Sequence, residues 1–249
     1  MKLYKFSKLA RFLSVAIIGS SVLTAGCSLL DNQPEEKTVE DKSKEEDSLI
    51  ANMDSATVFE RCDLYYSSEN YTEAFKYCKK SAKEGNALAQ FNLGYMYHRG
   101  YGARQEHLDL IGAMDAARNW FQKAAEQGIV EAQYNLGYMY NNGEGGLLNN
   151  TKAIEWYQKA ADQGHTSAQY NLGLMYYNGQ GVKQDYFKAV EWWQKAADQG
   201  DVSAQYNLGI MYQYGQGVKQ NYTKAKEYFG LACDNKDQKG CDIYKELNQ

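Results

Sequence analysis

The sequence predicts an all-α protein built from stacked pairs of helices, and three observations carry this prediction. Nearly the same nine residues recur as AQYNLGYMY at 132–140, AQYNLGLMY at 168–176 and AQYNLGIMY at 204–212. The glycines that close successive units, Gly128, Gly164 and Gly200, lie 36 residues apart, a period typical of helical arrays. The chain of 249 residues contains one proline, the residue that most strongly interrupts helices.

Residues 1–26 are predicted to form an export signal. Four basic residues precede an apolar run from Phe12 to Val22, and small residues then lead to Cys27. The stretch LTAGC at 23–27 resembles the box at which bacterial lipoproteins are cut and lipidated. The resemblance implies that Cys27 becomes a lipid-bearing N-terminus, and that Ser28 permits sorting to the outer membrane. Plain secretion is the alternative.

Residues 27–50 are predicted to be a disordered, acidic tether behind the lipidated cysteine. Between Asp31 and Asp47 the chain carries eight acidic residues, three lysines, its single proline and no aromatic residue. Removing residues 1–26 takes away four positive charges and changes the formal net charge from −4 to −8. A nucleic-acid partner is therefore not expected, because no basic face could neutralise phosphates.

Each repeating unit is predicted to contain two helices, most clearly between Ala168 and Gly200. Leu172 and Met175 have helical spacing, and Gly173 leaves room for a neighbouring helix. The loop YNGQG at 177–181 should end the first helix. A second helix should run from about residue 185 to 199, with large and small apolar residues on one side.

The ordered motifs L-G-x-M-Y, N-G-x-G, K-A, W-x-x-K-A-A and G-x-x-x-A-Q resemble the Sel-one-like repeat (SLR) family. The resemblance implies a right-handed α-solenoid of antiparallel helix pairs, related to tetratricopeptide arrays. Residues 86–236 then hold four repeats, at 86–128, 129–164, 165–200 and 201–236. Residues 51–85 look like a tetratricopeptide-type hairpin without the glycine loop, and residues 237–249 look like a capping helix.

Four cysteines beyond Cys27 allow three pairings. In the repeat alignment, Cys62 takes the place of the first-helix glycine, and Cys78 takes that of Phe121, Tyr157, Trp193 and Phe229. Those faces should meet, which predicts a Cys62–Cys78 bridge. The spacing of Cys233 and Cys241 is similar to that of bridges in cysteine-rich members of the family, and implies a second one. Both would staple an end of the array, and both require an oxidising compartment.

The first helices of such solenoids line a concave groove, and this resemblance assigns candidate binding residues. An asparagine two residues before the repeat glycine recurs as a ladder that can pair with an extended peptide backbone. The alternative is that each asparagine ties its helix to the next. The ladder consists of Asn92, Asn135, Asn171 and Asn207, and its aromatic neighbours are Phe91, Tyr134, Tyr170, Tyr206, Tyr95 and Tyr138. These aromatic residues are candidate anchors for a partner, or part of the packing between repeats.

Seven extra residues in the first full repeat break its symmetry, within 103–120. Four basic side chains gather near this insertion: His98, Arg99, Arg104 and His107. Such a patch could read a partner's carboxylate, although most insertions are tolerated surface loops.

Catalytic and metal-binding motifs are not found. The chain lacks S-x-x-K with K-T-G, a C-x-x-C pair and H-E-x-x-H, so neither a cofactor nor a metal ion is expected. The sequence favours a non-enzymatic scaffold that holds a segment of another protein. It is expected in the bacterial cell envelope, lipid-anchored to the outer membrane and facing the periplasm. Family members commonly serve as adaptors in envelope assembly, polysaccharide export, signalling or host contact. The alternatives are an envelope hydrolase of the β-lactamase type and a glycan-binding protein.

Overall fold

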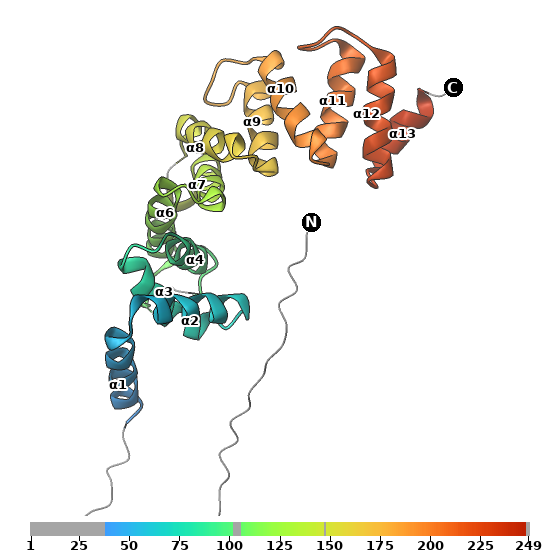
Figure 1. Ribbon diagram of the computed structural model, residues 1–249. Coiled ribbons are helices and arrows are strands. Elements are labelled where there is room, and N and C mark those ends of the chain that lie inside the picture. Colours follow the sequence, from blue (N-terminus) through green and yellow to red (C-terminus); the bar gives the residue numbers. More distant parts are fainter. Residues whose placement is uncertain (1–37, 102–105, 147, 248–249) are drawn as a thin grey trace, which may run out of the picture.

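The computed structural model describes residues 38–101, 106–146 and 148–247, and within these residues every regular element is helical. The elements are α1 (Val39–Asn52), α2 (Ser55–Ser67), α3 (Tyr71–Lys83), α4 (Ala87–His98), α6 (Leu110–Glu126), α7 (Val130–Asn142), the 3₁₀ turn η1 (Glu144–Gly146), α8 (Asn150–Asp162), α9 (Thr166–Asn178), α10 (Tyr186–Asp198), α11 (Val202–Tyr214), α12 (Tyr222–Asp234) and α13 (Gln238–Glu246). Figure 1 shows them stacked in chain order along a curved arc. The predicted all-α solenoid is confirmed.

The helix boundaries of the inner units follow from local chemistry. At the start of α9, the backbone N–H of Ala168 donates to Nδ1 of His165 at 3.2 Å. Helix α9 ends at Gly179, whose left-handed conformation (φ 68°) is one that glycine adopts without a Cβ clash. The Asp185 carboxylate then caps α10 by accepting from the N–H of Lys188 at 3.1 Å. The two-helix unit is therefore encoded within each repeat.

A glycine on each first helix leaves room for a large side chain from the second helix of the same unit. A Cβ added to Gly173 would lie 2.3 Å from Nε1 of the Trp193 indole. The same close approach joins Gly94 to Phe121, Gly137 to Tyr157 and Gly209 to Phe229, at 2.8, 2.7 and 2.7 Å. These large side chains are buried, so the glycine allows two helices to pack around one interdigitated side chain.

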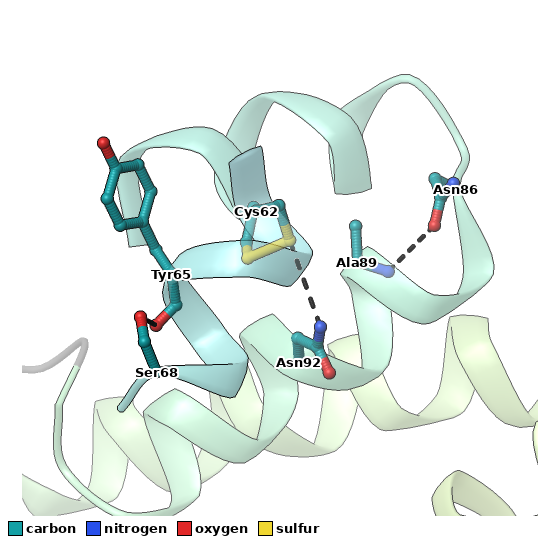
Figure 2. Close-up of a disulfide and its surroundings, with 7 residues drawn as sticks. Cys62, Tyr65, Ser68, Asn86, Ala89 and Asn92 are labelled. Carbon is teal, nitrogen blue, oxygen red and sulfur yellow. Dashed lines mark hydrogen bonds between the residues drawn. A yellow bond between two sulfur atoms is a disulfide. The ribbon is translucent and has the colours of Figure 1, made fainter. Parts of the chain in front are cut away.

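The N-terminal hairpin of α2 and α3 closes the corresponding position with a disulfide. Cys62 and Cys78 are bonded and both fully buried, and their Cα atoms lie 4.7 Å apart (Figure 2). A second disulfide joins Cys233 of α12 to Cys241 of α13, with Cα atoms 4.4 Å apart. The structure thus contains both pairs expected from the sequence, one toward each end of the described array.

The segment expected to be a tether differs from expectation in its second half. Residues 39–52 form α1, which begins with a capping box between Thr38 and Asp41. Lys76 of α3 binds Glu46 at 2.8 Å, and the Nζ atom of Lys80 donates to the carbonyls of Ile50, Ala51 and Met53. Acidic composition alone therefore did not exclude a helix, because α3 supplies cations that hold it.

The predicted export signal and Cys27 lie outside the described residues. Within the described part of the chain, none of the helices combines the length and the apolar character needed to span a bilayer.

Candidate functional site

The first helices of the units carry the candidate groove residues. In Figure 1, α4, α7 and α9 lie closer to the inside of the bend than α6 and α8 do. Phe91, Tyr134, Tyr170 and Tyr206 are half-buried at equivalent positions of α4, α7, α9 and α11. Tyr138 is 39% exposed, and Tyr95 is half-buried. The first helices therefore carry a partly exposed aromatic ring once per repeat, while part of each ring packs within the array.

Several of these rings contact one another or the second helices. Phe91 lies 5.9 Å from Phe121, and Tyr134 lies 5.8 Å from Tyr157, between ring centroids. The Tyr206 ring meets Phe229 edge-on at 5.6 Å. These ring contacts show that the aromatic row takes part in the packing of the array, and its role as an anchor for a partner stays a prediction.

The four asparagines do not share one environment. Asn92 is 5% exposed, and its amide nitrogen lies 4.0 Å from the Sγ atom of Cys62 (Figure 2). Asn135 donates to the carbonyl of Glu131 at 2.6 Å, a bond within its own helix. Asn171 and Asn207 are half-buried. Asn92 therefore belongs to the packing around the disulfide, and the other three asparagines are only partly buried.

Polar groups meet most closely between α7, α8 and α9. Burial raises the pKa of Tyr134 and of Tyr157, and the nearby Asn171 amide lowers both pKa values in part. The His165 ring stacks on Tyr134 with centroids 4.5 Å apart, and burial lowers the pKa of His165. The Tyr157 side chain is fully buried, and its hydroxyl lies near the Asn171 amide.

A second amide ladder, missed in the sequence, lies two residues before each asparagine. Gln90, Gln133, Gln169 and Gln205 are 4–5% exposed. The amide of Gln169 donates to the Ala161 carbonyl at 3.1 Å, and its oxygen accepts from Gln199 at 2.8 Å. The other three glutamines repeat this pattern, with Asn235 replacing the outer glutamine in the last unit. This ladder connects successive units, and its recurrence in every A-Q pair was the available signal.

The insertion lengthens α6, and the basic side chains near it have different surroundings. Helix α6 has 17 residues, against 13 in α8 and α10. Nε2 of His98 lies 2.7 Å from the Glu144 carboxylate in η1, the turn of the next unit. Arg99 is exposed beside the Tyr95 ring, and His107 is exposed. Arg104 lies outside the described residues, so the patch of four basic side chains stays a prediction.

Glu106, which sequence reasoning did not select, is the acidic centre of this region. It accepts from Lys79 of α3 and from the Tyr97 hydroxyl of α4. Burial raises the pKa of Glu106, but these two hydrogen bonds outweigh it and hold the pKa below its ordinary value. The insertion is therefore tied to the N-terminal hairpin by an ion pair.

No group of three or more His, Cys, Asp or Glu side chains in the described ranges has the arrangement of a metal site. The partly exposed side chains at the candidate positions of the first helices are amides, phenols and other aromatic rings, which suit recognition of a polypeptide.

The Sel1 repeat family model matches five segments of the chain, at residues 64–86, 87–129, 130–165, 166–201 and 202–237. Its first segment falls in the N-terminal hairpin, which the sequence had set apart from four full repeats. No curated protein matches the chain significantly.

Two solved structures are similar in both sequence and fold. The first is c5321, described as a protective antigen present in uropathogenic Escherichia coli strains and displaying an SLR fold. It is 33% identical with a TM-score of 0.68, and the match covers 74% of this chain but only 39% of that protein. The second is a Sel1 repeat protein from Oxalobacter formigenes, 32% identical with a TM-score of 0.63, covering 75% of this chain and 74% of that one.

Proposed function

Because the chain belongs to the Sel1 repeat family, we propose that it is an adaptor of the bacterial envelope that holds an extended segment of a partner protein against its inner side. Proteins with Sel1 repeats generally mediate protein–protein interactions and are mostly non-enzymatic scaffolds. A scaffold role fits this chain, and the anchored location and the extended ligand are the proposed refinements.

The observation that carries the proposal is the recurrence of a half-buried aromatic ring beside a half-buried asparagine on α7, α9 and α11. An amide side chain both donates and accepts, so it can bind a backbone peptide unit of any sequence. The aromatic rings add apolar contact area at each step and favour particular side chains. An extended segment laid across the first helices would meet one such pair per repeat.

The envelope location is supported by the cysteines and by the N-terminal sequence. Two disulfides are stable in an oxidising compartment such as the periplasm. Lipidation of Cys27, at the end of the export signal, would anchor the chain to a membrane, most simply the outer membrane facing the periplasm. Radioactive palmitate should label the native protein and not a Cys27→Ser variant; equal labelling of the two would contradict the anchor.

The test of the adaptor function is capture from an envelope extract under conditions that preserve disulfides. The bait is the mature chain, and the test variant replaces Asn135, Asn171 and Asn207 by alanine. The matched control replaces Gln122 and Gln158, whose amides donate to Glu126 and Asp162 on their own helices. Gln194 is left unchanged, because its amide oxygen also accepts from the Tyr228 hydroxyl of α12.

The expected result is a protein retained by the native bait and by the glutamine variant, and lost from the asparagine variant while its helicity is unchanged. Retention of glycan alone would favour a carbohydrate-binding role. If the asparagine variant loses its helical signal, the ladder is structural and the groove assignment fails.

A further inference from the structure

Two open clefts occupy equivalent positions in the last two repeats. The first, of about 480 Å³, lies at the loop before α10, and the second, of about 430 Å³, lies at the loop before α12. The lining residues that correspond are 36 residues apart in the sequence: Tyr176 and Tyr212, Val182 and Val218, Lys183 and Lys219, Asp185 and Asn221, Lys188 and Lys224. The clefts are therefore two copies of one feature of the repeat, and we call them the lysine clefts.

The loops that line the lysine clefts are fixed against the helices of the preceding units. Gly181 has a left-handed conformation (φ 73°), and a Cβ at this residue would lie 2.6 Å from the backbone of Asn150 at the start of α8. Gly217 makes the same close approach to the backbone of Tyr186 at the start of α10. Each cleft is therefore formed before a ligand binds, which lowers the entropic cost of binding.

Each cleft has two exposed lysines, one in the loop and one on the helix that follows: Lys183 and Lys188 in the first, Lys219 and Lys224 in the second. The Nζ atom of the helix lysine lies 5.1 or 5.0 Å from the centroid of the tyrosine ring of its own cleft. None of these four lysines forms an ion pair with a carboxylate of the described residues, whereas Lys76, Lys79 and Lys80 of α3 each do. The four ammonium groups are therefore available to an anionic ligand.

The charge of each cleft suits one carboxylate. A single acidic residue lines each cleft, Asp185 in the first and Glu191 in the second, so two lysines and one acid leave one net positive charge. The Asp185 carboxylate already accepts from the backbone N–H of Lys188. The whole chain has a formal net charge of −4, so an acidic ligand would be repelled by much of its surface and attracted to the clefts.

Apolar side chains adjoin these charges and favour a polypeptide over an acidic glycan. Phe187 is 72% exposed, and it lines the second cleft together with Val190 and Val218. A polypeptide with aliphatic side chains beside its acids would cover this apolar surface. A glycan carries hydroxyl groups along its length, so it would leave Phe187 without apolar contacts.

From these contacts and charges we propose that the lysine clefts are a second interaction surface, which binds an acidic segment of a partner protein with one carboxylate in each cleft. In Figure 1 the loops before α10 and α12 lie toward the outer side of the bend. The inference goes beyond the proposed adaptor function and does not depend on it. If both hold, the chain joins two partners through different surfaces.

The first test measures binding of a defined acidic peptide to the mature chain by fluorescence anisotropy. The probe is a fluorescein-labelled peptide of four Ser-Glu-Val triplets, which presents a carboxylate about every 10 Å when extended. It should bind at least tenfold more tightly than the peptide in which glutamine replaces glutamate. Equal binding of the two peptides would overturn the proposal.

The second test locates the binding site with matched lysine variants. The variant Lys183→Gln, Lys219→Gln should weaken binding of the acidic peptide about fivefold, because two exposed ion pairs are lost. The control Lys159→Gln, Lys195→Gln removes the same charge from exposed positions over Trp156 and Trp192, and should change the affinity less than twofold. Equal weakening by both variants would show attraction by overall charge alone, and would overturn the clefts.

Charge reversal and competition complete the test. The variant Lys183→Glu, Lys219→Glu should prefer a peptide of four Ser-Lys-Val triplets, and failure of this exchange would contradict a direct ion pair in the clefts. Polygalacturonate should displace the acidic peptide only weakly, and tighter binding of this glycan through the same lysines would overturn the polypeptide assignment.

The two proposals fail separately. The variant in which alanine replaces Asn135, Asn171 and Asn207 should bind the acidic peptide as the native chain does. Loss of binding in that variant would place the peptide on the first helices and overturn the lysine clefts. Failure of the clefts alone would leave the adaptor function standing.

Discussion

The N-terminal hairpin and the inner repeats hold two helices together at the same place by different means. In α9 and α10, the glycine at 173 admits the Trp193 indole between the helices. In α2 and α3, Cys62 and Cys78 replace these two residues with a covalent bond. The inner units are covered by neighbours on both sides, whereas the hairpin has a full neighbour only at α4. This end unit thus has a covalent link where an inner unit relies on burial.

The largest effect should come from removing the covalent link. A Cys62→Ser, Cys78→Ser variant should lose about 2–4 kcal/mol of stability in the hairpin, because the unfolded chain gains entropy and buried hydroxyls replace the bond. Hydrogen exchange by mass spectrometry should show faster exchange in 55–83 and little change in 166–198. Equal acceleration in both regions would mean that the hairpin is not a separate end unit.

The next effect concerns the glycine of the inner unit. Gly173→Ala should destabilise the protein by about 1–3 kcal/mol, because the new methyl group overlaps the rigid Trp193 ring. Helix propensity alone would give the opposite sign, a gain of about 1 kcal/mol. Urea unfolding distinguishes the two, and a Gly173→Ala, Trp193→Leu variant should recover part of the loss. A stabilised single variant would refute the close-packing account.

A smaller effect is expected for the glutamine ladder between units. Gln169→Leu leaves the Ala161 carbonyl and the Gln199 amide without their partner, which should cost about 1–2 kcal/mol. The control is Gln158→Leu, an outer glutamine bonded to Asp162 of its own helix, which should change stability by less than about 0.5 kcal/mol. Thermal unfolding measures both, and similar losses would show that burial of the ladder is not decisive.

The smallest global effect should follow from Lys80→Met. Losing the ammonium that binds the last carbonyls of α1 should speed exchange of the amides in 39–52 about tenfold, a change of about 1.4 kcal/mol in local opening. The melting temperature of the repeats should stay within about 1 °C, because α1 buries only one side chain among those described, Ile50. Unchanged exchange would show that α1 is held without this lysine.

The sequence predicts those features that are repeated or local. Helix pairs, the turn at 177–181 and the start of the second helix near residue 185 depend on neighbouring residues, so the repeat pattern contains them. The Cys62–Cys78 contact was also predictable, because aligning the units places both cysteines at a contact that recurs in the other units.

Features that depend on three-dimensional neighbours were harder to predict. Asn92 matches the other asparagines in sequence, but its neighbour is Cys62 of the end hairpin, and it is buried. The acidic composition of α1 favoured a disordered tether, although the capping box between Thr38 and Asp41 indicates the start of a helix. Glutamine is usually exposed, so the burial of the four glutamines is explained only by their hydrogen-bond partners on neighbouring helices.

The central claim is that a partner protein binds the inner side of the array, and its most direct test is site-specific photo-crosslinking in living bacteria. A benzophenone amino acid replaces Tyr138 on the inner side, and in a matched variant it replaces Lys159 beside Trp156 on the second helix of the same unit. The adaptor account predicts a discrete crosslinked protein from position 138 and none from position 159. Crosslinking from 159 alone would contradict the account, because the partner would then bind the opposite surface of the array.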